Sequence, residues 1–147
     1  MDLGRYRIRK KKEVDMNMPR GIRNNNPGNI EYNGTSWRGL AEPPHDGRYC
    51  IFTDAVYGIR AMARILKTYY SKHGLNTVAG IINRWAPPVE NNTSAYIEHV
   101  ARVVGVSEHE PFNVLDKLPE LIEVIIQHEN GVQPYTLHTI IEGVELA

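Results

Sequence analysis

The segment from Asn24 to Asn29 constrains the fold of this chain more than any other. It reads Asn-Asn-Asn-Pro-Gly-Asn, an order that suits neither a regular helix nor a regular strand. Proline presets φ and glycine accepts a positive φ, so Pro27-Gly28 fixes a turn. The asparagine amides can hydrogen-bond to the loop itself or to a polar ligand. The segment is therefore either a loop held by its own side chains or one wall of a saccharide-binding groove.

Residues beyond this loop favour the saccharide-binding interpretation. Sugars are held by amide and guanidinium hydrogen bonds together with an aromatic platform. Aromatic and guanidinium groups follow the loop closely, and a second tryptophan comes later in the chain. We expect the groove to be lined or supported by Asn25, Asn29, Trp37, Arg38 and Trp85.

Length and charge limit the possible classes of protein. The 147 residues suffice for one domain with a buried core. The formal net charge is +0, whereas a dedicated nucleic-acid binder carries a basic excess. No apolar run is long enough to span a bilayer, and no apolar stretch typical of a signal peptide follows the basic start. We expect neither nucleic-acid binding nor membrane insertion.

Capping residues, turn-forming residues and apolar spacing along the chain predict one mostly helical domain. Residues 1–18 are rich in Arg and Lys and poor in apolar groups, so we expect a basic, flexible tail there and a folded domain over 19–147. Asn33-Gly34, Pro43-Pro44 and Asp46-Gly47 indicate turns between short strands, one of which spans 48–52. Capping residues and apolar spacing predict helices over 54–73, 77–86, 92–104, 116–130 and 136–142. The expected fold class is predominantly helical α+β with a small antiparallel sheet.

Glu129 is an acidic residue on the apolar face of a predicted helix. That face is formed by Leu121, Ile122, Ile125 and Ile126, and Glu129 occupies its next position. Burial and the negative end of the helix dipole both disfavour the ionised carboxyl. Both effects raise its pKa, as a general acid near neutral pH requires. The alternatives are a structural pair with an arginine or a side chain turned toward solvent.

Other carboxylates compete for a catalytic role. Glu31, on a predicted strand beside the asparagine-rich loop, is the rival acid. A glycoside hydrolase normally uses a second carboxyl group, for which Asp46, Asp54 and Glu90 are candidates. Each of these three also has a structural explanation, as a turn residue, a helix cap and a loop residue.

Two other chemistries have little support. A cysteine peptidase needs a positioned histidine and a thiolate-favouring site, whereas the single cysteine, Cys50, lies on a predicted strand where a buried inert thiol is expected. The six histidines show no convincing ligand spacing, and His128 is expected to be exposed. We therefore expect no metal and no cofactor.

Four motifs after Pro19 are long enough to be specific: Arg20-Gly-Ile-Arg-Asn-Asn-Asn-Pro-Gly-Asn-Ile, Trp37-Arg-Gly39, Gly58-Ile-Arg-Ala61 and Arg84-Trp-Ala-Pro-Pro-Val-Glu-Asn-Asn-Thr93. Together they resemble a family of small phage and prophage proteins described as virion-associated or lysis-related and lysozyme-like. The resemblance implies a lysozyme-like single domain over 19–147.

Two further motifs are similar to those of glucosaminidases, goose-type lysozymes and lytic transglycosylases. Ile126-Gln-His-Glu-Asn-Gly131 resembles the helix end that carries their catalytic glutamate, and Thr93-Ser-Ala-Tyr96 matches a Thr-x-x-Tyr of the transglycosylases. The similarity implies Glu129 as the general acid, with Tyr96 as its hydrogen-bonding partner. In those enzymes the acid helix precedes the asparagine-rich segment, so the similarity implies a circularly permuted domain.

We therefore expect a peptidoglycan-degrading muramidase, a lysozyme or lytic transglycosylase that cleaves between N-acetylmuramic acid and N-acetylglucosamine. The expected partners are peptidoglycan glycan strands and other virion proteins. The expected location is the phage virion or the host cell, where the protein acts on the bacterial cell wall. The alternative is a non-catalytic virion structural or glycan-binding protein that keeps the groove without turnover.

Overall fold

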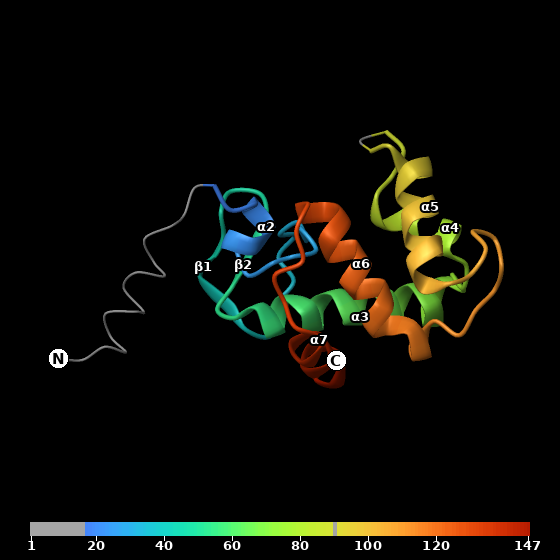
Figure 1. Ribbon diagram of the computed structural model, residues 1–147. Coiled ribbons are helices and arrows are strands. Elements are labelled where there is room, and N and C mark those ends of the chain that lie inside the picture. The colour runs from blue at the N-terminus through green and yellow to red at the C-terminus, as the bar shows by residue number, and fades with distance from the viewer. Residues whose placement is uncertain (1–16, 90) are drawn as a thin grey trace.

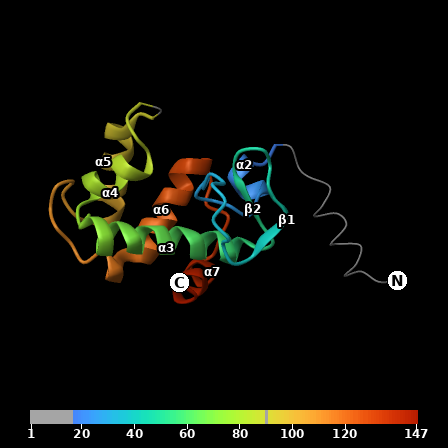
Figure 2. The same cartoon turned by 180° about the vertical axis from the view of Figure 1, so that it is seen from behind.

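Helix α6, Leu118–Asn130, lies at the centre of the fold. The computed structural model describes residues 17–89 and 91–147. In it α6 contacts α2 (Arg20–Arg23), α3 (Ala55–His73), α5 (Thr93–Val104) and α7 (Leu137–Glu145). Figure 1 shows α6 crossing α3, with α2 and the sheet toward one end and α4 (Val78–Trp85) and α5 toward the other. From behind, α3 runs the length of the helical part, with α7 beneath it (Figure 2).

The apolar face of α6 forms the middle of the core. Leu121, Ile122, Ile125 and Ile126 are fully buried, as their spacing predicts. Each such side chain contributes about 1.5–3 kcal/mol when it is removed from water. Because α6 packs on four other helices, its apolar side chains connect most of the helical part into one core.

Capping residues place most helix ends where the sequence predicts them. Asp54 accepts a hydrogen bond from the Val56 amide at 2.9 Å and begins α3, and Gly74 ends it in the left-handed conformation. Thr77, Asn92 and Thr136 cap α4, α5 and α7 in the same way. Helix α6 begins later than predicted because a 3-10 turn, η1 (Leu115–Lys117), occupies the preceding residues.

The sheet has two antiparallel strands, β1 (Leu40–His45) and β2 (Cys50–Phe52), and this confirms the predicted fold class. The turn predicted at Pro43-Pro44 was wrong, because both prolines lie within β1. A two-stranded sheet leaves one edge of each strand unpaired, and a proline on such an edge withdraws no ladder hydrogen bond. Asn33-Gly34 forms a local turn rather than a hairpin between strands, with Asn33 Oδ1 accepting from the Thr35 amide at 3.1 Å.

The asparagine-rich segment is held by its own side chains, and it directly follows a helical turn, α2, that the sequence did not predict. Asn26 is fully buried, and its Nδ2 donates to the carbonyls of Ile30 and Cys50 at 3.0 Å each. Its Oδ1 accepts from the Ile30 amide at 3.0 Å. Asn25 and Asn29 have φ of 52° and 51°, a left-handed conformation that asparagine tolerates better than most residues.

The same segment is seated directly on α6 and α3. Asn130, in the last turn of α6, donates from Nδ2 to the Pro27 carbonyl at 2.8 Å. Gly58 of α3 faces the Asn25 carbonyl so closely that a Cβ would collide with it. These two contacts fix the loop beside the C-terminal end of α6, where Glu129 lies.

Residues 1–16 of the predicted tail over 1–18 lie outside the described residues, and so does Glu90. Within the described ranges, no helix is both long and apolar enough to cross a lipid bilayer.

Asn26→Ala should destabilise the fold, because it removes three buried hydrogen bonds and leaves the Ile30 amide without its acceptor, although the Ile30 carbonyl keeps its bond from the Cys50 amide. An unsatisfied buried group costs about 1–3 kcal/mol, so we expect the free energy of unfolding to fall by at least about 2 kcal/mol in urea denaturation. Asn33→Ala is the matched control, since it removes only an exposed turn contact. Equal destabilisation of the two variants would contradict the role given to Asn26.

Candidate active site

A cleft with a volume of ≈ 410 Å³ opens between the asparagine-rich loop, the middle of α3 and the C-terminal ends of α4 and α6. Its walls carry amide, aromatic and carboxyl side chains together. They include Asn29, Glu31, Tyr49, Tyr69, Trp85 and Glu129. This combination suits a polyhydroxylated ligand, which needs hydrogen bonds at its edges and apolar surface under its rings.

Glu129 is held at the wall of this cleft by two hydrogen bonds. The Tyr96 hydroxyl donates to Oε2 at 2.9 Å, and Asn29 Nδ2 donates to Oε1 at 3.3 Å. One donor comes from α5 and the other from the asparagine-rich loop, so three segments distant in sequence meet at one carboxyl group. The partnership between Tyr96 and Glu129 that the motifs imply is present.

The environment of Glu129 favours its neutral form. Burial raises the pKa of Glu129, and the hydrogen bonds from Tyr96 and Asn29 offset only part of that rise. The structure therefore confirms the raised pKa predicted from the helix pattern. A carboxyl group of this kind can hold a proton closer to neutral pH and deliver it to a bound ligand.

Tyr96 is suited to hold the carboxyl group and not to exchange protons with it. Its side chain is almost completely buried. Burial raises the pKa of the Tyr96 hydroxyl well above its usual range, and the nearby Glu129 charge raises it further. The hydroxyl thus remains a hydrogen-bond donor over the whole working range of pH.

Two histidines border the Tyr96–Glu129 pair. The exposed His128 stacks its ring on Tyr96, with centroids 3.7 Å apart and planes inclined by 23°. Its Nδ1 lies 3.3 Å from Nδ1 of His99 on α5. Partial burial and the proximity of His99 lower the pKa of His128.

Two of the five residues expected to form the saccharide groove line the cleft. Asn29 lies beside Glu129, and Trp85 forms an aromatic wall with Tyr69, their rings 6.4 Å apart and nearly perpendicular. Tyr69 and Tyr49 were missed as cleft residues. The Tyr69 ring, on α3, meets the Trp85 ring at the end of α4, and this contact between distant segments brings it to the cleft wall.

The other three expected groove residues do not line the cleft. The Asn25 amide donates to the Phe52 carbonyl at 3.0 Å, which ties the loop to β2. Trp37 is partly buried against the core. The Arg38 guanidinium lies over the Tyr57 ring, 5.6 Å from its centroid. These side chains are engaged elsewhere in the fold, which corrects the expectation drawn from their closeness in sequence.

Of the other candidate carboxylates within residues 17–89 and 91–147, only Glu31 reaches the cleft. It is exposed and forms an ion pair with Arg48 at 2.9 Å. Asp46 pairs with Arg20 at 2.6 Å, and this hydrogen bond holds the pKa of Asp46 well below its usual range. Asp54 caps α3. Asp46 Oδ1 also accepts from the Arg48 and Tyr49 amides at 3.1 and 2.8 Å, so Asp46 and Asp54 have the turn and cap roles that the sequence offered as their alternatives.

Cys50 is a fully buried free thiol whose pKa is raised by burial, so it lacks the thiolate character of a nucleophile. Among residues 17–89 and 91–147, no group of three or more His, Cys, Asp and Glu side chains is arranged to hold a metal ion.

The stability of the protein should depend on the ionisation of Glu129. Because folding raises its pKa, the folded state binds this proton more tightly than the unfolded chain does. The protonated Glu129 carboxyl therefore contributes to the free energy of unfolding. This contribution is complete below the unfolded-state pKa of about 4.3 and is lost as the pH rises through the higher folded-state pKa. Glu129→Gln removes this loss, so we expect its melting temperature to exceed that of the wild type at about pH 8 and to match it near pH 4.

The measurement is thermal unfolding followed by circular dichroism at both pH values. Glu98→Gln is the matched control, because the Glu98 side chain is 71% exposed and its contact with Arg102, at 4.0 Å, is a long surface ion pair. A lower melting temperature of Glu129→Gln at the higher pH would contradict the prediction.

Comparison with known proteins supplies the family. No protein-family model matches the sequence. Protein P5 of Pseudoalteromonas phage PM2 is 44% identical over 129 residues, which cover 86% of this chain and 80% of that protein. The expected relationship to phage proteins is thereby confirmed, while lysozyme-like activity stays a prediction. This chain belongs to the same family as Protein P5 of phage PM2.

Proposed function

We propose that this protein is a phage-associated muramidase, which cleaves the peptidoglycan glycan strand between N-acetylmuramic acid and N-acetylglucosamine. One observation carries the proposal: Glu129, a carboxyl group with a raised pKa, lies in the wall of an amide- and aromatic-lined cleft. Glycosidic cleavage needs such a group because the departing oxygen must be protonated as its bond breaks.

Glu129 is the general acid of the proposed reaction. Its proton passes to the glycosidic oxygen, and the carboxylate that remains is stabilised by hydrogen bonds from Tyr96 and Asn29. These two donors do not need to move during the step, since they already contact the two carboxyl oxygens. The same carboxylate then takes a proton from the hydroxyl group that attacks the sugar.

The arrangement of carboxylates supports the lytic transglycosylase form of this reaction. Among the described residues that line the cleft, Glu31 is the second carboxylate, and its ion pair with Arg48 stabilises it as a surface group. Hydrolysis normally needs a second carboxyl as base or nucleophile. A transglycosylase needs none, because a hydroxyl of the sugar itself closes the ring, and Glu129 can serve as acid and then as base.

A second candidate function is a phage structural or glycan-binding protein without turnover. The observation that favours it is the identity of 44% to a phage protein, which supports the phage role and not a particular chemistry. A groove that binds glycan can exist without catalysis, since a fold does not specify its chemistry. The two candidates differ in one result, the release of soluble glycan fragments from purified peptidoglycan.

Glu129→Gln should abolish lysis while leaving the fold and wall binding intact. The amide keeps size and polarity but cannot donate an acidic proton, so the rate should fall by about a hundredfold or more. The measurement is zymography on purified peptidoglycan, with mass analysis of the released fragments to separate hydrolysed from 1,6-anhydro products.

Glu31→Gln is the matched control and should keep most of the activity. The reverse pattern would make Glu31 the acid. A wild-type protein that binds peptidoglycan and releases nothing would replace the muramidase by the glycan-binding alternative.

Trp85→Ala should weaken the binding of muramic-acid-containing oligosaccharides by roughly tenfold, because it removes an aromatic wall of the cleft. Trp37→Ala should leave binding per folded molecule unchanged, since Trp37 packs against the core outside the cleft. Isothermal titration measures both. A loss of binding in Trp37→Ala alone would contradict the placement of the ligand.

A further inference from the structure

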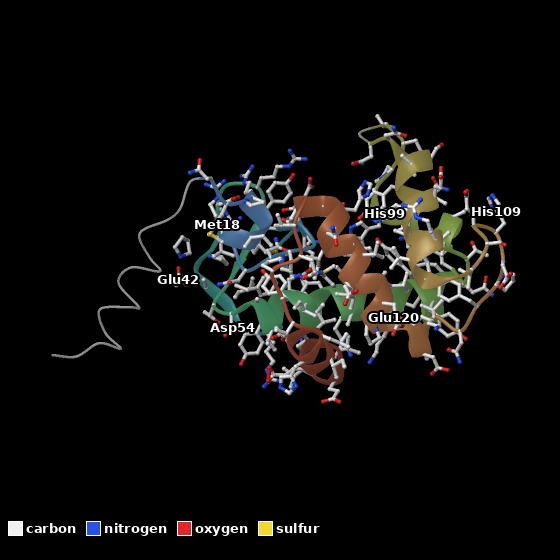
Figure 3. All side chains as sticks on the ribbon, in the orientation of Figure 1. Met18, Glu42, Asp54, His99, His109 and Glu120 are labelled. Atoms are coloured by element: carbon white, nitrogen blue, oxygen red, sulfur yellow. The ribbon has the colours of Figure 1, made fainter. Side chains whose placement is uncertain are left out.

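His99 and His128 form a pair of imidazoles that the proposed reaction does not use. His99 belongs to α5 and His128 to α6, and the two positions are 29 residues apart in sequence. Their Nδ1 atoms lie 3.3 Å apart, and the ring centroids are 5.5 Å apart with planes inclined by 45°. Figure 3 shows His99 on the side of α5 that faces α6.

The separation of the two nitrogens matches the edge of a tetrahedral zinc site. Zn–N bonds of about 2.0–2.1 Å at the tetrahedral angle place two ligand nitrogens about 3.3–3.4 Å apart. A direct hydrogen bond would also be possible at 3.3 Å, but this distance lies beyond the usual range for an N–H donor. The two nitrogens therefore already have the spacing that a bound ion would impose.

The surroundings hold the His128 ring in place and keep the two helices together. His128 stacks on the buried Tyr96 ring at 3.7 Å, which fixes the plane of its imidazole. The helices that carry the two histidines pack directly on each other. Within the described part of the chain, neither ring makes a hydrogen bond to a carboxylate, so an ion would not have to displace one.

We propose that His99 and His128 together bind a divalent transition-metal ion of the Zn²⁺ type, with water completing the coordination. Two imidazole nitrogens select zinc, copper, nickel or cobalt over magnesium and calcium, which prefer oxygen ligands. With two protein ligands the ion binds reversibly, unlike the closed four-ligand sites that hold structural zinc.

Such an ion would connect α5 to α6 beside the Tyr96–Glu129 contact. It binds the folded arrangement and not the unfolded chain, in which the two histidines are separated, so it should raise thermal stability in proportion to its concentration. The site does not depend on the muramidase proposal, because the test measures metal binding and not lysis.

The test is isothermal titration of the full-length, tag-free protein with ZnCl₂, alongside Co²⁺ absorption spectra and thermal unfolding. We expect one Zn²⁺ per chain, a rise in melting temperature with Zn²⁺ and no response to Mg²⁺. His99→Ala and His128→Phe should each weaken Zn²⁺ binding at least about tenfold, since even the loss of an outer-shell partner has an effect of this size. His128→Phe keeps a ring to stack on Tyr96 and removes only the ligating nitrogen.

His73→Ala and His138→Ala are the matched controls, because both positions are exposed and lie on other helices. They should bind Zn²⁺ as the wild type does. The proposal is overturned if the wild type binds no Zn²⁺ at millimolar concentration, which would make the pair a hydrogen bond only. It is also overturned if folded His99→Ala and His128→Phe bind Zn²⁺ as tightly as the controls.

Discussion

The seating of the asparagine-rich loop on the end of α6 is the contact on which the rest of the cleft depends. The Asn130 amide donates to the Pro27 carbonyl at 2.8 Å, and Asn26 closes the loop onto Ile30 and Cys50. Each of these groups is buried, so losing a partner leaves an unsatisfied donor or acceptor away from water. The loop therefore has one well-defined position, and that position brings Asn29 to Glu129.

Glu129 illustrates how packing produces a chemical property. The apolar face of α6 carries the carboxyl group into a partly buried place, where desolvation raises its pKa. The donors on α5 and on the loop limit that rise and would stabilise the charge once the proton has left. A group that can hold and release a proton results from this balance, and it supports the proposed acid role better than any single motif does.

The same junction of α5 with α6 connects the two proposals. Tyr96 contacts Glu129 through its hydroxyl and His128 through its ring face, so one buried side chain lies between the candidate acid and the candidate metal site. The relationship to Protein P5 of phage PM2 establishes a phage family and leaves the chemistry to experiment. Release of glycan fragments and binding of Zn²⁺ are separate measurements, so each proposal can fail without the other.

The sequence by itself determined helices α3 to α7 and the place of Glu129 on the apolar face of α6, because capping residues and apolar spacing act within one segment. The turn predicted at Pro43-Pro44 and the groove position predicted for Trp37 were wrong, since strand edges and core contacts depend on residues that are distant in sequence. The cleft, the ion pair of Glu31 and the meeting of His99 with His128 were decided only by the tertiary structure. These three features join segments that are far apart in the chain, and the spacing of residues within one segment does not indicate which helices pack together.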